Sequence, residues 1–306
     1  MTVRLPLATI CVGHSWNASV YIVSMGVSHD SANSGSGTDG ELSATATPKH
    51  PWWALAALLL GLSMIIIDGS VVNVLLPTMV DDLDLTQTDA QWINSIYSLV
   101  FAALLITVGL LADKYGRRLL FITGIVIFIV GSIASGSSQN ADFLIAARAI
   151  QAVGASMMLP SSIAVINVLF TGRNRAVAFG LWGAVFGGAA ALGPLLGGWL
   201  AQDFSWRWAF YINIPIAVAS AIAVLLTVPE TKVPHVGKID IVGVLLSAIG
   251  LGLIVFGLIE GQAYGWWTAI NDFQLGPINL NTGGMSVVPF AFLIGVVLLG
   301  LLVAWE

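Results

Sequence analysis

Two charged side chains interrupt long apolar runs of this chain: Asp68 in IIIDGSVVNVLLP and Arg148 in LIAARAIQAVGASMMLP. A charge in the middle of a membrane helix costs about 2.5 to 3.5 kcal/mol on insertion scales, so each needs a partner or a function. Burial disfavours the charged form of a carboxyl group, and a nearby arginine favours it. A carboxylate under both influences suits the uptake and release of a proton. We therefore predict that Asp68 is a proton or cation site and that Arg148 is its partner.

Both charges also have simpler explanations. Asp68 is the only acidic residue that we expect deep in an apolar run, and it could form a static ion pair that fixes helix packing. Arg148 follows Asp142 by six residues, so its side chain could snorkel to a membrane interface. These alternatives remain open at the level of sequence.

A second candidate is the short polar segment GLLADKYGRRLL, residues 109 to 120. Asp113 can hold the arginines that follow it, or the positive N-terminal end of a neighbouring helix. Gly116 allows a tight turn, and Arg117 and Arg118 face the anionic leaflet. Basic residues alone would only mark the side of the membrane on which the loop lies.

A third candidate is GLWGAVFGGAAALGPLLGGWL, residues 180 to 200. Small residues let helices approach closely in lipid, and Pro194 removes a backbone hydrogen bond and can kink the helix. Because glycine-rich membrane helices are common, this spacing is a weak signal when taken alone.

These residues must be positioned by membrane-spanning helices. Of the 306 residues, 57% are hydrophobic and 9% are charged, against about 25% charged in soluble domains. A span needs roughly 20 mostly apolar residues. The recurrence of such runs argues against a soluble helical protein with a buried core. The sequence predicts eight spans: 53–79, 91–112, 119–138, 142–166, 176–201, 208–228, 240–259 and 287–305.

The loops between the predicted spans alternate between basic and non-basic. Basic residues in short loops mark the cytoplasmic side, so the alternation places both termini in the cytoplasm. The loop before residue 91 contains four aspartates and no basic residue, and the loop near residue 207 contains a single arginine. The basic loops contain Lys114, Arg117, Arg118, Arg173, Arg175, Lys232 and Lys238.

The first 50 residues differ in composition from the rest. Residues 29–50 are polar and poor in bulky side chains, and we predict that residues 1–50 form a disordered cytoplasmic tail. Residues 1–28 contain a broken apolar run that could be a signal peptide, but a start site at Met25 is the favoured explanation. The single cysteine excludes an internal disulfide, and no metal-like, nucleic-acid-binding or enzymatic motif is present.

Taken together, these motifs resemble the major facilitator superfamily. The pattern G-x-x-x-D-x-x-G-R-R resembles its signature loop, at Gly109, Asp113, Gly116, Arg117 and Arg118. The resemblance implies a conformational latch there. R-x-x-Q-x-x-G, at Arg148, Gln151 and Gly154, resembles a motif in which the family links the arginine to proton coupling.

Two further segments resemble the drug:proton antiporters of this superfamily. The antiporter motif corresponds to Gly180, Gly193, Pro194, Gly197 and Gly198, with Ala189 where a glycine is usual. It implies a kinked helix that limits proton leak. The segment around Asp68 resembles the fourteen-helix branch, and so does FSWRWAFYINIP, in which we interpret Trp206 and Trp208 as interfacial anchors. Some drug exporters carry an acidic residue at the position of Ser95, which puts a preference for dicationic drugs in doubt.

The resemblance implies an all-α membrane protein with about eight transmembrane helices. Residues 51–230 would form the N-terminal six-helix half of a major facilitator fold, and residues 231–306 would add two linker helices, with the C-terminal six-helix domain absent. The implied function is proton-coupled efflux of small hydrophobic or cationic compounds across the cell membrane, driven by the proton gradient without a cofactor. A second chain could supply the missing half. The alternative is a truncated membrane protein with no transport of its own.

Overall fold

The computed structural model describes residues 50–231, 240–271, 273–275, 278–280 and 284–305. The tail predicted for residues 1–50 lies outside the described residues, except for His50. Within the described ranges, eight helical stretches are long and apolar enough to cross a membrane. The predicted all-α membrane fold with about eight spans is therefore confirmed.

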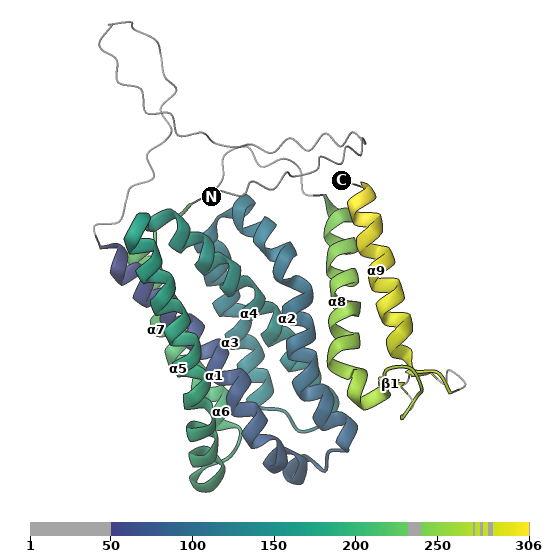
Figure 1. The fold of residues 1–306 in the computed structure, drawn as a ribbon. Coiled ribbons are helices and arrows are strands. Elements are labelled where there is room, and N and C mark those ends of the chain that lie inside the picture. Colours follow the sequence, from purple (N-terminus) through teal and green to yellow (C-terminus); the bar gives the residue numbers. More distant parts are fainter. Residues whose placement is uncertain (1–49, 232–239, 272, 276–277, 281–283, 306) are drawn as a thin grey trace, which may run out of the picture. The chain divides into compact units, whose positions relative to one another are not determined.

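From α1 to α7 the helices follow one another with short connections, and longer ones precede α8 and α9 (Figure 1). Seven spans are single helices, and the span after α5 combines a short α6 with α7. The bounds are α1 Pro51–Leu83, α2 Gln87–Tyr115, α3 Arg117–Gly136, α4 Ala141–Leu169, α5 Gly172–Asp203, α6 Trp208–Tyr211, α7 Asn213–Thr227, α8 Ile241–Tyr264 and α9 Val287–Trp305.

Most of the helices extend past the apolar runs into polar residues, and side-chain caps stabilise the first turns of α2, α4 and α8. At the start of α2, the Thr86 side chain and the Asp89 carboxylate form a reciprocal capping box. Helix α8 continues five residues beyond the predicted end of its span, so it includes Glu260, which is only 3% exposed. The prediction that Asp68 is the only acidic residue deep in an apolar run is therefore wrong.

The connection between α8 and α9 contains the only strands found in the described part of the chain. Strands β1 (Phe273–Leu275) and β2 (Ile278–Leu280) pair antiparallel, with Phe273 opposite Leu280. The Phe273 ring lies 5.4 Å from the Tyr264 ring and 5.7 Å from the Phe256 ring, measured between centroids. These aromatic contacts tie the hairpin to α8.

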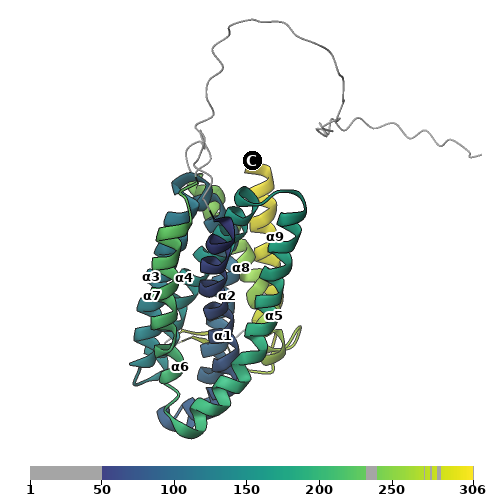
Figure 2. The same ribbon diagram turned by 90° about the vertical axis from the view of Figure 1, so that its left-hand side faces the viewer.

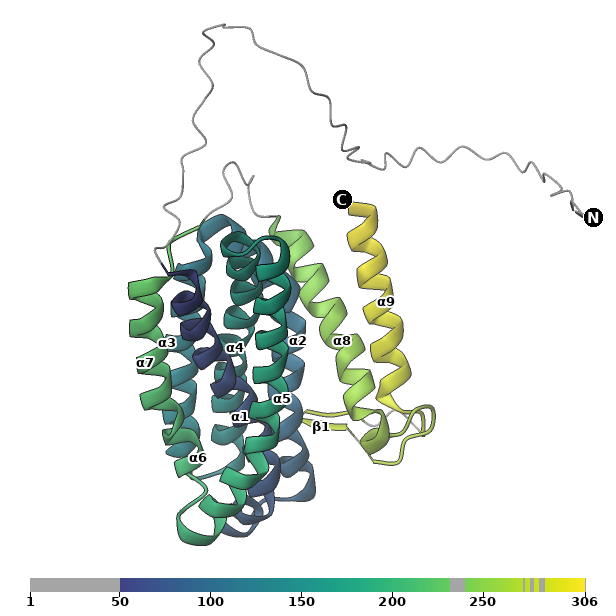
Figure 3. The same cartoon turned by 60° about the vertical axis from the view of Figure 1, so that its left-hand side comes forward.

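Helix α1 packs between α5 and α7, as Figure 2 shows, and α3 packs along α4. Glycines bring α3 and α4 close together: a Cβ at Gly154 would lie 2.4 Å from Phe128 N, and one at Gly131 would lie 2.6 Å from Gln151 N. Helix α8 lies beside α2, and α9 lies along α8 (Figure 3). The six-span part therefore contacts the last two spans through α2.

The close approach of α3 and α4 predicts the effect of adding one methyl group. Gly154→Ala should destabilise the protein by about 1 to 3 kcal/mol, because the new Cβ overlaps the α3 backbone. The matched control is Gly183→Ala on α5, where a Cβ meets nothing within 4 Å. Thermal unfolding in detergent should show a lower melting temperature for Gly154→Ala only. Equal melting temperatures for both variants would contradict the packing described here.

Candidate functional site

A buried ion pair joins α1 to α4. Arg148 Nη1 donates a hydrogen bond to Asp68 Oδ2 over 2.5 Å, and both residues are 1% exposed. The structure thus brings the two predicted residues into contact. It places Arg148 in the protein interior, so the snorkelling alternative is wrong. Because two charges are removed from solvent together, each depends on the other for compensation.

Neutral amides complete the coordination of the Asp68 carboxylate. Its Oδ1 accepts hydrogen bonds from Gln151 Nε2 over 2.7 Å and from Asn213 Nδ2 over 2.8 Å. Both amides also donate to Ser132 Oγ, over 2.9 Å and 3.2 Å. Asp68 is therefore bound by side chains from two other spans, α4 and α7, and Ser132 of α3 joins the cluster through the two amides.

The Arg148 guanidinium is held on two sides. Gln151 Oε1 accepts a hydrogen bond from Nη1 over 2.7 Å, because residues three apart share one face of α4. The guanidinium carbon lies 4.2 Å from the Tyr97 ring centroid and 5.9 Å from that of Phe210, which are cation–π distances. Arg148 Nε donates no hydrogen bond to the described part of the chain. The Nε–H group is thus available to donate a hydrogen bond to another acceptor.

Asn213 and Ser132 were not predicted as members of this site. Asn213 lies in the YINIP segment, which carried only a family resemblance, and Ser132 lies in an ordinary apolar run. Neutral polar side chains are common in membrane helices, so their sequence gives no signal comparable with a charge. Only the packing of α3 against α4 and of α7 against α1 reveals their role.

The predicted latch residues form a turn between α2 and α3. Gly116 adopts a φ of 116°, a conformation that favours glycine. Asp113 Oδ1 accepts hydrogen bonds from Arg117 Nη2 over 2.8 Å and Nε over 3.1 Å. Arg117 also donates through Nη1 to the Ala164 carbonyl of α4, over 3.3 Å. Gly109, the first residue of the pattern, has open space around a Cβ.

Glu230, which follows α7, caps the first turn of α3. Its carboxylate accepts hydrogen bonds from the backbone N–H groups of Arg118 and Leu119, over 3.2 Å and 3.1 Å. The Thr231 carbonyl accepts a further bond from Arg117 N over 3.1 Å. A carboxylate is favourable at the N-terminal end of a helix. The sequence did not predict this contact, which spans more than 110 residues.

The residues of the antiporter motif divide into two groups. A Cβ at Gly193 would overlap Ser70 of α1, and one at Gly197 would lie 3.0 Å from Val74 Cβ. These two glycines therefore allow α5 to approach α1. Gly180 and Gly198 meet nothing within 4 Å of a Cβ. Pro194 lies inside α5, next to the contact with α1.

A second polar cluster lies at the opposite ends of the helices. Asp82 Oδ2 accepts hydrogen bonds from Trp206 Nε1 over 2.9 Å and from Arg207 Nη1 over 2.7 Å. Arg207 also donates to the Ser138 carbonyl over 3.1 Å. Trp206 is 1% exposed, so its interpretation as an interfacial anchor is wrong, whereas Trp208 is 53% exposed. The indole of Trp206 is buried because its N–H meets Asp82.

The comparison with known proteins identifies the family. The family model of the Major Facilitator Superfamily matches residues 58–305. The chain belongs to this superfamily. It is an integral membrane protein, as its eight apolar spans also indicate. The predicted family is therefore confirmed.

Relatives and solved structures agree with this membership. The chain is 38% identical over 216 residues to the puromycin resistance protein pur8 of Streptomyces alboniger, covering 70% of this chain and 43% of the relative. It is 37% identical over 210 residues to the multidrug efflux pump LfrA of Mycolicibacterium smegmatis, covering 68% and 42%. The human organic anion transporter MFSD10 superposes with a TM-score of 0.55 at 14% identity, over 69% of this chain and 56% of that chain, which supports the fold alone. The chain thus spans about two fifths of the length of these curated relatives.

The Glu230 contact predicts a stability effect away from the buried pair. Glu230→Ala removes the acceptor for two backbone N–H groups of α3 and should cost about 0.5 to 2 kcal/mol, as the loss of a helix cap does. Glu230→Gln keeps one side-chain oxygen and should cost less. Thermal unfolding in detergent would rank the three proteins. A Glu230→Ala protein as stable as the parent would show that the cap contributes nothing.

Proposed function

We propose that this chain takes part in proton-coupled efflux of small hydrophobic or cationic compounds, as half of a transporter of the major facilitator type. The observation that carries the proposal is the contact of Asp68 with Arg148 inside the spans. The names of the relatives, which include multidrug efflux and antibiotic resistance proteins, support export as the activity. The proton gradient supplies the driving force without a cofactor, and we propose transport rather than catalysis.

In this mechanism Asp68 changes partners when it takes up a proton. A protonated carboxyl group attracts the guanidinium less strongly, so Arg148 would rely on Gln151 and on its contact with the Tyr97 ring, or find another acceptor. The helices that contribute to the cluster, α1, α3, α4 and α7, would shift against one another as a result. The static ion pair is the competing explanation for the same geometry, and only a transport measurement separates the two.

Transport in this fold requires two halves, because the substrate pathway lies between domains that rock against each other. We propose that further polypeptide supplies the second half, either as another chain or as a second copy. The relatives named above support this proposal, since the chain spans only 43% and 42% of their lengths. The alternative is a membrane protein without transport of its own.

Replacement of the buried carboxylate tests the proton role. Asp68→Asn keeps the shape and the amide contacts but cannot ionise, so energy-dependent efflux should fall to the level of cells without the protein, at unchanged protein level. Efflux of a fluorescent drug would be measured with and without a protonophore, in cells with this chain alone and in cells that also contain a C-terminal half. Asp142→Asn, at an exposed carboxylate, is the matched control and should pump normally.

Each outcome decides between the proposals. Normal protonophore-sensitive efflux by Asp68→Asn would remove Asp68 from the mechanism and favour the static pair. Efflux only in the presence of the C-terminal half would support a two-part transporter. A parent protein that gives no efflux in either setting would favour the alternative without transport.

We propose further that both chain termini lie in the cytoplasm, since the arginine-rich turn at Gly116 lies on that side under the positive-inside rule. In a Cys11→Ser background, Tyr115→Cys should react with a membrane-impermeant maleimide only after permeabilisation. Asp203→Cys, at the exposed end of α5, should react in intact cells. The reverse labelling pattern would invert the topology.

A further inference from the structure

A second carboxylate inside the spans lacks the compensation that Asp68 receives. Glu260 of α8 is 3% exposed, and its Oε1 accepts no hydrogen bond from the described part of the chain. Ser95 of α2 faces its carboxylate across the space between the two helices. Across the described ranges, no lysine, arginine or histidine forms an ion pair with it. Among the described residues Glu260 therefore has no counter-ion, whereas Asp68 has Arg148.

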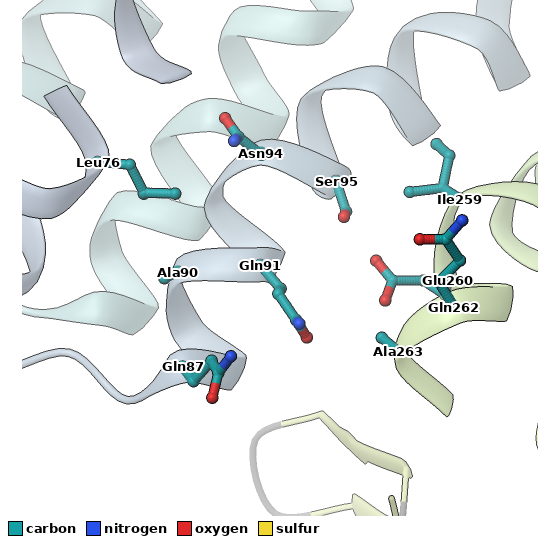
Figure 4. A pocket seen from close by; sticks show the side chains of 10 residues that line it. All are labelled: Leu76, Gln87, Ala90, Gln91, Asn94, Ser95, Ile259, Glu260, Gln262 and Ala263. Atoms are coloured by element: carbon teal, nitrogen blue, oxygen red, sulfur yellow. The ribbon is translucent and has the colours of Figure 1, made fainter. Parts of the chain in front are cut away.

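Glu260 borders a cavity between α2 and α8. The cavity has a volume of about 590 Å³, and Figure 4 shows the Glu260 carboxylate directed from α8 toward Ser95 and Gln91 of α2. Polar residues at 87, 91, 94 and 95 line the wall formed by α2, because this spacing brings them to one face of a helix. Gln262 adds a further amide from α8. One formal negative charge and several neutral dipoles thus surround the space, and none of the ten lining residues is basic.

Aromatic packing fixes the distance between the two walls. The Trp92 ring of α2 stacks on the Phe256 ring of α8 at a centroid distance of 6.2 Å, on the turn before Glu260. Asn94 donates through Nδ2 to Asn73 Oδ1 over 2.7 Å, which ties the α2 wall to α1. Side-chain contacts therefore fix both helices that border the cavity. The residues that line it are distinct from those that bind Asp68.

The volume selects the class of cation. Small-molecule sites occupy about 300 to 1,000 Å³, and this cavity falls within that range. A bare metal ion needs several oxygen ligands at about 2.0 to 2.6 Å, which one carboxylate in so large a space does not supply. No group of three or more potential metal ligands occurs among the residues that the structure describes. An organic cation fits both the charge and the size.

We propose that this cavity binds a small organic cation, a protonated or quaternary amine, with Glu260 as its counter-ion and Gln91, Asn94 and Ser95 as neutral polar contacts. The acidic group of this site comes from α8, one of the two helices outside the six-span part. The inference deepens the proposed efflux function and rests on it for its biological role. Equilibrium binding tests it without any transport step.

The experiment measures binding of radiolabelled tetraphenylphosphonium, which is permanently charged, to the purified chain in detergent, with protein-free micelles as the blank. The parent protein should bind saturably. Glu260→Gln keeps the size and the contact with Ser95 but removes the charge, and it should weaken binding at least tenfold. Glu260→Asp should retain most of the affinity. Asp142→Asn, the matched control at an exposed carboxylate, should bind like the parent.

A second variant keeps the test decisive if Glu260→Gln fails to fold. Ala263→Trp leaves the carboxylate in place and fills the cavity, so it should also abolish binding. Unchanged affinity in either folded variant would overturn the site, and so would equal binding of the neutral analogue triphenylphosphine oxide. Binding that depends on Glu260 in a protein without efflux would preserve the site and remove the proposed function. Efflux by a protein whose binding does not depend on Glu260 would overturn the site and preserve the proposed function.

Discussion

The structure depends on one constraint: a carboxylate inside the membrane spans must be compensated. Asp68 meets this constraint through Arg148, Gln151 and Asn213, which come from α4 and α7. Ser132 of α3 reaches this cluster because α3 lies directly against α4, and the glycines at 124, 131 and 154 make that approach possible. Replacing a buried ion pair with apolar residues is often neutral or stabilising, so the retention of this pair is weak evidence for a purely structural role.

Two polar clusters at the helix ends frame this interior. On one end, the Asp113–Arg117 turn is bound to the segment at Glu230 and to the α4 backbone. On the other end, Asp82 joins the loops after α1, α3 and α5 through Trp206 and Arg207. Each cluster connects spans that also contribute to the Asp68 site. A rearrangement at Asp68 would therefore reach both ends through rigid helices rather than through loops.

The sequence predicted those features that depend on local composition or on a large energetic cost. Spans follow from length and hydropathy, and the Asp68–Arg148 contact followed from the cost of each charge in lipid. It could not predict Ser132 or Asn213, whose neutral side chains cost little, or Glu230, whose contact joins distant segments. Glu260 was missed because the hydropathy falls at EGQ, whereas the helix continues to Tyr264. Trp206 shows the same limit. Tryptophan is typical of membrane interfaces, and its burial here depends on the hydrogen bond to Asp82, which only the tertiary structure reveals.

The two hydrogen bonds to Asp82 Oδ2 differ in one physical respect. Both charged side chains of the Asp82–Arg207 pair are partly exposed, at 47% and 31%, so dissolved ions weaken their attraction. The indole N–H of Trp206 is neutral and buried, and it is little affected by ionic strength. Rising salinity would thus loosen the arginine while the tryptophan stays in place. This end of the helices has one contact that responds to the surrounding electrolyte and another that does not, whereas Asp68 and Arg148 are shielded from it entirely.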